Sequence, residues 1–407
     1  MRILWLLLLA VASAVAQTGT WNYQNIYSFQ GGADGGGPGG LVIGPQGIYG
    51  TLSSSGQYGG IFLLTPPAAL GGQWTETTLY NFQGGADGNG PAGPLTIGSN
   101  GEIYGTTMYG GLSNALCGYG CGTVFQLTPP AAPAGAWTET VLYRFQGPPD
   151  AYNPVSGAVV GPDGSLFGTT EEGGSQTPPP SGNGAVYQLT PPAAAGGAWT
   201  ETVIHSFSQS GPAGCDPVAG LTLGANGVLY GSTDACSTPT IFSLTPPAVP
   251  GGGWTMSLIR EFGTAGALAM DADGRLYAAA YNPLLQLTPP AVPGGNWSQV
   301  ILHVFGTGGG RGAELMAGPA LGADGAVYGT TFWGGASDSG LVYQLLPPNA
   351  AGGSWTENVL YSFVQKDFGA GGLPVIVGPS GALYGVSFLG AFSEGAVFEL
   401  TRADARR

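Results

Sequence analysis

The chain repeats one segment seven times, and this repetition constrains its fold more than any other feature. Each copy opens with Trp and closes with Phe eight residues later, at 21–29, 74–82, 137–145, 199–207, 254–262, 297–305 and 355–363. After each copy come a short apolar run, a turn glycine and an aromatic strand, and six copies then reach a Pro-Pro pair. A period of a few tens of residues predicts one supersecondary unit per repeat.

Each repeat contains four expected strands, which we letter a to d. Strand a precedes the turn glycine, b follows it, c ends at Pro-Pro and d is the Trp-to-Phe segment. Five of the seven turn glycines follow Asn or Asp, as Gly101 follows Asn100, and we expect these dipeptides to close two-residue hairpins. Four-stranded units repeated radially define a propeller. The sequence therefore predicts an all-β, seven-bladed β-propeller.

The two ends of the chain complement each other. The repeats begin with a d strand and end with a c strand at 396–401, so the last blade, 373–401, lacks its outermost member. We expect 21–29 to complete that blade, because closure removes an exposed sheet edge. An open β-solenoid is the competing architecture, and it does not explain the complementary ends. We expect one propeller domain over 17–407.

The first sixteen residues are typical of a secretory signal peptide. Arg2 supplies the positive charge, 3–11 the apolar stretch and Ala14 to Ala16 the small-residue cleavage site. We therefore expect a secreted or periplasmic monomer that begins near Gln17. The net charge of −14 disfavours nucleic acid and anionic lipid as partners, and no apolar run is long enough for membrane insertion.

The loops differ in how much their lengths vary. From Pro66 to Trp74 the c-to-d link spans eight residues, and the other five links match it. In contrast, 28 residues separate Gly101 from Pro129, but only 15 separate Gly274 from Pro289, an interval that contains the b-to-c loop. Because successive strands alternate in direction, the d-to-a and b-to-c loops share one face. Variable loops on a rigid scaffold are where binding is usually found.

A repeated motif resembles a known family. Tyr-Gly-Thr-Thr at 104–107 and 328–331, followed by Gly-Gly and a Val-Phe-Gln-Leu-Thr-Pro-Pro strand at 124–130, resembles the GloVer tandem repeat of secreted bacterial proteins. The resemblance covers essentially the whole mature chain. It implies an exported repeat protein of a group that carries alternative C-terminal anchors, and since 401–407 shows no anchor, we expect a freely secreted or periplasmic form. It implies no catalytic residues.

Four cysteines in an exported chain predict two disulfides. Cys117 and Cys121 lie in one b-to-c loop, whereas Cys215 precedes the fourth blade and Cys236 lies in its b-to-c loop. We expect Cys117 to pair with Cys121 and Cys215 with Cys236. A metal site at the first pair lacks a nearby His.

Carboxylates are the remaining chemistry. Asp34, Asp87 and Asp150 each fall five residues after a strand-d Phe, where they could bind Ca²⁺ around the channel mouth or cap their own turns, and we favour capping. Ca²⁺ is the one cofactor that the sequence leaves open. The repeated acids Glu76, Glu139, Glu201 and Glu357 are assigned to the opposite, fixed face as structural residues, and His205 and His303 as packing residues.

The variable face also carries unrepeated acids and aromatic residues. The candidate ligand-binding residues there are Asp87, Tyr109, Tyr119, Asp150, Tyr152, Glu171, Glu172, Asp234 and Trp333. Our leading hypothesis is a non-enzymatic propeller that binds a glycan or protein partner, since no nucleophile–His or metalloprotease motif occurs. The alternative is a carbohydrate-active enzyme, a glycoside hydrolase or lyase, using paired carboxylates. A purely structural extracellular repeat protein is the third reading.

Overall fold

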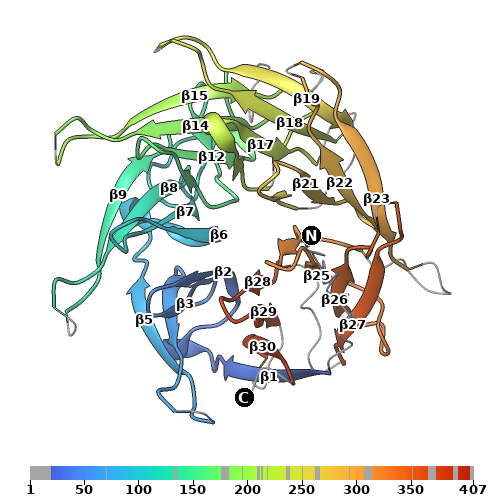
Figure 1. Ribbon diagram of the computed structural model, residues 1–407. Coiled ribbons are helices and arrows are strands. Elements are labelled where there is room, and N and C mark those ends of the chain that lie inside the picture. Colours follow the sequence, from blue (N-terminus) through green and yellow to red (C-terminus); the bar gives the residue numbers. More distant parts are fainter. Residues whose placement is uncertain are drawn as a thin grey trace, which may run out of the picture.

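A computed structural model describes the chain from residue 20 to residue 403. Within that range it leaves out 70, 133–134, 176–182, 195, 209–210, 212–213, 218, 235–238, 250, 262–265, 293, 307–313, 351, 365–372 and 388–392. The fold is a seven-bladed β-propeller whose blades are four-stranded antiparallel sheets, as the repeats predicted. Figure 1 shows the blades arranged in a ring around the middle of the molecule.

The strands of each blade run in chain order from the centre outward, apart from the last blade. The innermost strands of blades one to seven are β2 (Pro38–Gly44), β6 (Asn89–Ile97), β11 (Val159–Val160), β16 (Thr222–Leu223), β20 (Ala269–Met270), β24 (Ala320–Leu321) and β28 (Ile376–Val377). The second strands are β3 (Gly47–Leu52), β7 (Ile103–Tyr109), β12 (Leu166–Thr170), β17 (Leu229–Ser232), β21 (Leu276–Ala279), β25 (Val327–Thr331) and β29 (Leu383–Ser387).

The third and fourth strands form the outer half of each blade. The third strands are β4 (Gly60–Thr65), β8 (Thr123–Thr128), β14 (Ala185–Thr190), β18 (Thr240–Thr245), β22 (Pro283–Thr288), β26 (Leu341–Leu346) and β30 (Ala396–Arg402). The outermost are β5 (Thr75–Asn81), β9 (Thr138–Arg144), β15 (Thr200–Ser206), β19 (Thr255–Glu261), β23 (Ser298–Val304), β27 (Thr356–Ser362) and β1 (Trp21–Ser28). A two-stranded sheet, β10 (Ala151–Tyr152) with β13 (Glu172–Gly173), and the 3₁₀ turns η1 (Gly32–Asp34), η2 (Gly85–Asp87) and η3 (Ala225–Gly227) complete the elements.

Ring closure is confirmed. Strand β1 pairs antiparallel with β30, from Trp21 opposite Arg402 to Ser28 opposite Ala396, and so becomes the outermost strand of blade seven. In Figure 1 the blue strand β1 lies beside the red β30. The amino-terminal strand therefore covers the edge of the last sheet, as expected.

Within a blade, a glycine of the second strand makes room for an aromatic ring of the third. Gly105 lies opposite Phe125, and a Cβ at Gly105 would fall 2.5 Å from the tip of that ring. Gly168 and Tyr187 repeat the arrangement in blade three. Blade five has neither the glycine nor the aromatic residue, since Ala278 lies opposite Leu285 there. The glycine of the Tyr-Gly-Thr-Thr motif is thus required by its aromatic neighbour.

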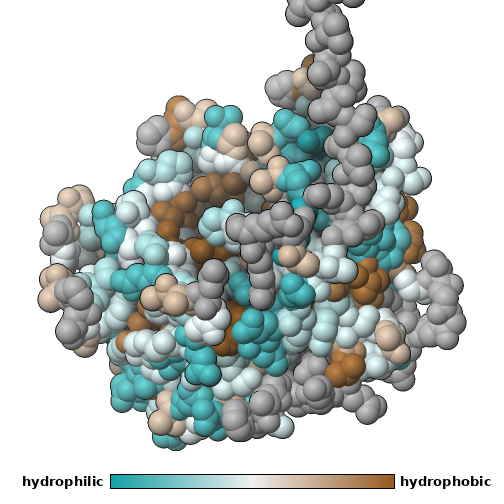
Figure 2. All heavy atoms as spheres, turned by 60° about the horizontal axis from the view of Figure 1, so that its bottom comes forward, coloured by the Kyte–Doolittle hydropathy of each residue, from teal (hydrophilic) through white to brown (hydrophobic). Residues whose placement is uncertain are grey.

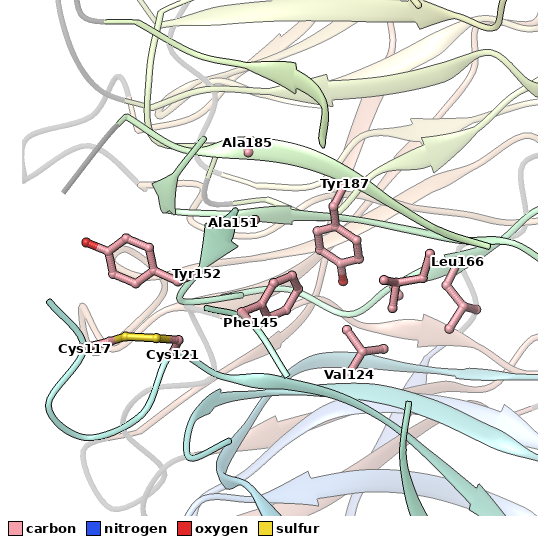
Figure 3. Close-up of a cluster of buried hydrophobic side chains, with 11 residues drawn as sticks. Cys117, Cys121, Val124, Phe145, Ala151, Tyr152, Leu166, Ala185 and Tyr187 are labelled. Atoms are coloured by element: carbon pink, nitrogen blue, oxygen red, sulfur yellow. A yellow bond between two sulfur atoms is a disulfide. The ribbon is translucent and has the colours of Figure 1, made fainter. Parts of the chain in front are cut away.

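Aromatic residues also join neighbouring blades. The Phe that closes an outer strand packs edge-on against the third-strand aromatic residue of the next blade, with Phe145 and Tyr187 at 5.1 Å. The Trp that opens an outer strand packs against the second strand of the preceding blade, as Trp137 does against Tyr49. Figure 3 shows Phe145 and Tyr187 in the core between blades two and three, with the Cys117–Cys121 disulfide near Tyr152.

Hydroxyl groups join the inner strands. Thr106 Oγ1 donates to the Ser156 carbonyl of the next blade at 2.8 Å, and Thr169 Oγ1 donates to the Ala219 carbonyl at 3.0 Å. These bonds satisfy buried carbonyl groups that face a neighbouring sheet rather than a ladder partner. The first Thr of the motif therefore links one blade to the next.

The a-to-b turns differ from the two-residue hairpins that we predicted. In the turns containing Asn-Gly or Asp-Gly the last paired residues lie six positions apart, as Val160 and Leu166 do. Gly164 donates to the Gly161 carbonyl at 3.0 Å and has φ +81°. This is a type I turn followed by a left-handed glycine, which needs positive φ at the glycine alone.

Among the described residues, no helix is long and apolar enough to cross a membrane.

Candidate functional site

Asp87 and Asp150 lie where an outer strand ends, and they cap their own turns. Asp150 Oδ2 accepts from the Gln146 amide at 2.8 Å and from the Tyr143 hydroxyl at 3.1 Å. Asp87 receives the equivalent bonds from Gln83 and Tyr80. Capping is therefore confirmed. In the part of the chain that the structure describes, no three His, Cys, Asp or Glu side chains form a metal-binding group.

The repeated glutamates begin their outer strands beside the c-to-d links, as predicted, but they make a contact that we did not predict. The carboxyl of Glu201 hydrogen-bonds that of Asp150 in the preceding blade, and Glu139 meets Asp87 in the same way. Sheet twist brings the start of one outer strand toward the end of the previous one. Burial first, and then the neighbouring aspartate, raises the pKa of Glu139 to about 7 and that of Glu201 to about 8. Because the arrangement recurs at equivalent positions, we assign it to blade–blade packing.

A different set of positions changes its chemistry from blade to blade. The residue that follows the second strand's Thr-Thr or its equivalent, which we call the strand-exit position, carries Ser53, Met108, Glu171, Asp234, Tyr281 and Phe332 in blades one to six. Only blades three and four place an acid there. The neighbouring approach position precedes the proline found at or shortly before the innermost strand, and it carries Gly37, Gly90, Asn153 and Asp216 in blades one to four.

The approach position requires left-handed backbone. Gly37 and Gly90 have φ of +60° and +65°, and Asn153 and Asp216 have +61° and +53°. Asn and Asp tolerate this conformation better than other non-glycine residues do, but at a cost. Blades one and two use glycine at this position, so Asn153 and Asp216 introduce backbone strain that glycine avoids. Such strain is typical of functional positions.

Hydrogen bonds join the strand-exit and approach residues in two groups, one within blade three and one across blades four and five. Asn153 Nδ2 donates to Glu171 Oε2 at 3.2 Å, the Asp234 amide donates to the Asp216 carbonyl at 3.3 Å, and the Tyr281 hydroxyl donates to Asp234 Oδ1 at 3.3 Å. Asn153 Oδ1 is buried without a hydrogen-bond partner. We call these five residues the acidic rim.

The acids of the rim raise one another's pKa. Burial first, then the charges of Glu172 and Asp216, raises the pKa of Glu171. Burial first, then the charges of Glu172 and Asp234, raises the pKa of Asp216. None of the four ion pairs found in the described part of the chain includes these carboxyls. The rim therefore favours proton uptake by its acids at pH values where free carboxyls are ionised.

The remaining predicted residues are spread over the same face. Tyr152 is only 4% exposed and lies in the core, where its hydroxyl bonds Glu172. Trp333 packs edge-on against Phe332 at 4.9 Å. Tyr109 and Tyr119 are exposed and contact each other, with ring centroids 6.3 Å apart. In Figure 2 apolar side chains (brown) gather around a hollow near the middle of the visible surface, among hydrophilic ones (teal).

One predicted disulfide is confirmed, between Cys117 and Cys121. Cys215 is also disulfide-bonded, and its predicted partner Cys236 lies outside the described residues. Asn153, Asp216 and Tyr281 of the acidic rim were not among the predicted residues. Aligning the residue before the proline found at or shortly before the innermost strand, and the residue after each Thr-Thr or its equivalent, would have singled out all three positions.

Comparison with known proteins identifies solved structures of the same fold. A fungal alcohol oxidase of the AA5 family, in complex with copper, has 15% identity and a TM-score of 0.54, over 96% of this chain and 79% of the oxidase. An extracellular domain assigned to a hybrid two-component system of B. thetaiotaomicron has 11% identity and a TM-score of 0.50, over 95% of this chain and 42% of that one. A gluconolactonase from Xanthomonas campestris has 12% identity and a TM-score of 0.42, over 76% and 85%.

These structures correct our leading functional hypothesis. The fungal alcohol oxidase is named as an enzyme, and our prediction of a non-enzymatic binding propeller is corrected in favour of the enzymatic alternative. Identities of 11 to 15% show the shared fold alone, so the substrate and the reacting residues must come from this chain. No protein-family model matches the sequence. No curated protein matches it either.

Proposed function

We propose that the protein is an enzyme that hydrolyses a glycosidic bond of a neutral carbohydrate at the acidic rim. The proposal rests on the group of carboxyls that blades three and four bring together. There burial, and then the charges of Glu172 and Asp216, raises the pKa of Glu171, and none of the ion pairs in the described chain includes these acids. Glycoside hydrolysis needs one protonated and one ionised carboxyl beside the scissile bond.

The rim residues supply these roles separately. Glu171, held by Asn153, protonates the leaving oxygen as the bond from that oxygen to the anomeric carbon breaks. Asp234, held by the Tyr281 hydroxyl, takes a proton from the water that adds to the anomeric carbon. The Asp216 carbonyl accepts from the Asp234 amide. Burial first, then the charges of Glu172 and Asp216, raises the pKa of Glu171 and so keeps it protonated at higher pH.

The charge of the rim favours hydrolysis over the lyase alternative. Lyases act on acidic sugars whose carboxylate must be neutralised, and the rim presents further negative charge instead. Elimination also requires a base, and Tyr281 is poorly suited because Asp234, with burial, raises its pKa. We therefore propose hydrolysis of uncharged sugars.

The proposal is tested by incubating the purified full chain with a panel of neutral polysaccharides and oligosaccharides and measuring new reducing ends. Glu171→Gln and Asp234→Asn should each lower the rate by about 10²-fold or more, because general acid–base catalysis contributes that much. Asp163→Asn is the matched control, since Asp163 only caps a turn at the opposite ends of the strands. Equal rates for Glu171→Gln and the parent would overturn the proposal.

We further propose that the enzyme acts outside the cytoplasm, as a secreted or periplasmic member of the GloVer group. Support comes from the Cys117–Cys121 disulfide, because disulfides persist mainly in oxidising compartments, and from the signal-like sequence at 1–16.

A further inference from the structure

The blade-two loop from Tyr109 to Cys121, which we call the tongue, has a conformation fixed by several bonds. The Cys117–Cys121 disulfide closes its tip, and the Cys121 amide donates to the Leu112 carbonyl at 2.8 Å. The Gly110 amide donates to the Tyr119 carbonyl at 2.9 Å. Asn114 accepts from the Leu116 amide at 2.8 Å and donates to the Gln146 carbonyl at 2.8 Å. The tongue is therefore shaped before any ligand binds.

This fixed loop exposes large apolar side chains. Tyr119, within the five-residue disulfide ring, is 86% exposed, and Leu112, Leu116 and Tyr109 are 47%, 44% and 39% exposed. Tyr109 supports Tyr119 edge-on, with ring planes 68° apart. A loop of fixed conformation that exposes apolar side chains to solvent is typical of a binding surface.

The tongue is uncharged, although the protein carries a net charge of −14. Residues 107–122 contain no Asp, Glu, Lys, Arg or His. Its exposed patch rests on four side chains, which is small beside the roughly 800 Å² that each partner contributes to a standard protein–protein interface. Tyrosine combines an apolar ring face with a polar hydroxyl, which suits the face of a neutral sugar ring.

Two backbone hydrogen bonds connect the tongue to the acidic rim. The Asn153 amide donates to the Cys121 carbonyl at 3.0 Å, and the Glu171 amide donates to the Asn153 carbonyl at 3.1 Å. A sugar chain bound at Glu171 would therefore find the tongue next to it. We propose that the tongue is a preformed subsite for a neutral sugar unit remote from the scissile bond, so that the substrate is an oligosaccharide or polysaccharide. This inference rests on the proposed hydrolase function.

The binding test uses the full chain carrying Glu171→Gln, which binds without turnover, and affinity electrophoresis in gels containing each neutral polysaccharide. Adding Tyr119→Ala should weaken retention about five- to tenfold, the effect of losing one aromatic contact. Tyr119→Phe keeps the ring and should retain binding, whereas Val249→Ala, at an exposed c-to-d link, should change nothing. Reducing the disulfide should weaken retention as Tyr119→Ala does.

A kinetic comparison separates the two proposals. In the active enzyme, Tyr119→Ala should lower kcat/KM about five- to tenfold on the polysaccharide and leave it unchanged on a short aryl glycoside that cannot reach the tongue. Unchanged retention of Tyr119→Ala on every bound polysaccharide, or an effect confined to a protein ligand, would overturn the subsite. Retention that depends on Tyr119 without product release from any sugar would support the subsite and overturn the hydrolase.

Discussion

At the scale of single residues, the acidic rim is defined by two side chains that stand where other blades use glycine. Asn153 and Asp216 occupy left-handed backbone at φ +61° and +53°, whereas Gly37 and Gly90 hold the same conformation without a Cβ. Left-handed backbone costs an L-residue on the order of 1 kcal/mol, less for Asn and Asp. The rim therefore lowers stability in return for a polar group at each position, as expected of a functional site.

Because of this strain, we expect that removing the Asp216 side chain raises stability and lowers activity. Asp216→Gly should raise the free energy of unfolding by about 1 kcal/mol, because it relieves the backbone and removes a carboxyl crowded by Glu172 and Asp234. The same change should lower the hydrolytic rate. Urea unfolding measures the first effect and reducing-end release the second. Gly90→Asn is the reverse control and should destabilise blade two; a less stable Asp216→Gly would contradict the strain argument.

The sequence predicted only part of this site. Glu171 and Asp234 could be predicted because they directly follow a recognisable strand on the variable face. Asn153, Asp216 and Tyr281 stand out in the sequence only as departures from the repeat, because their contacts depend on which loop residues meet across blades three to five. Tyr152 was predicted to bind ligand on the variable face, but the structure places it in the core, and a two-residue strand such as β10 leaves no alternation in the sequence that would indicate burial.

At the scale of strands, the repeat conserves pairs of residues rather than single ones. The glycine–aromatic pair of Gly105 and Phe125 becomes Ala278 and Leu285 in blade five, where both members change together. A Cβ on Gly105 would lie 2.5 Å from the Phe125 ring, closer than two carbons can approach. The pair therefore acts as one packing unit.

A double-mutant cycle tests this pair. Gly105→Ala should destabilise the protein by about 2 kcal/mol, the usual scale of overpacking. Phe125→Leu should also destabilise it, by loss of aromatic packing with Phe82 at 5.1 Å. The double variant, which reproduces the blade-five pair, should be more stable than the sum of the single changes predicts, with a coupling of about 1 kcal/mol in thermal unfolding. Strict additivity would show that the two residues are independent.

At the scale of the whole molecule, the architecture could be predicted from the sequence because every level of the pattern agreed. Repeat number, strand count, loop lengths and the complementary ends, Trp21 and Arg402, all specify one closed ring. The repeat pattern does not predict the twist within each blade. Twist lets Glu139 and Glu201, which begin their strands beside the c-to-d links, reach carboxyls of the preceding blades, and no sequence period reports such a contact.

These carboxyl pairs make the stability of the ring depend on pH. Glu201 faces Asp150 and Tyr143, and Glu139 faces Asp87, Tyr80 and Arg144. Folding raises the pKa of Glu139 from its ordinary 4.5 to about 7 and that of Glu201 from 4.5 to about 8, so the folded protein binds more protons than the unfolded chain between these values. The stabilisation from each proton is complete below pH 4.5 and is lost as the pH rises to 7 or 8.

We therefore expect the melting temperature to fall as the pH is raised from about 4.5 to about 8, with each pair contributing on the order of 1 kcal/mol after allowance for its solvent exposure. The double variant Glu139→Gln/Glu201→Gln cannot ionise at these positions and should flatten the profile. Glu102→Gln is the control, because bonds from Asn100 lower the pKa of Glu102 and its contribution has the opposite sign. If the melting temperature of the double variant fell with pH as steeply as that of the parent, these carboxyl pairs would hold no extra proton. Hydrophobic packing alone would then set the stability of the ring.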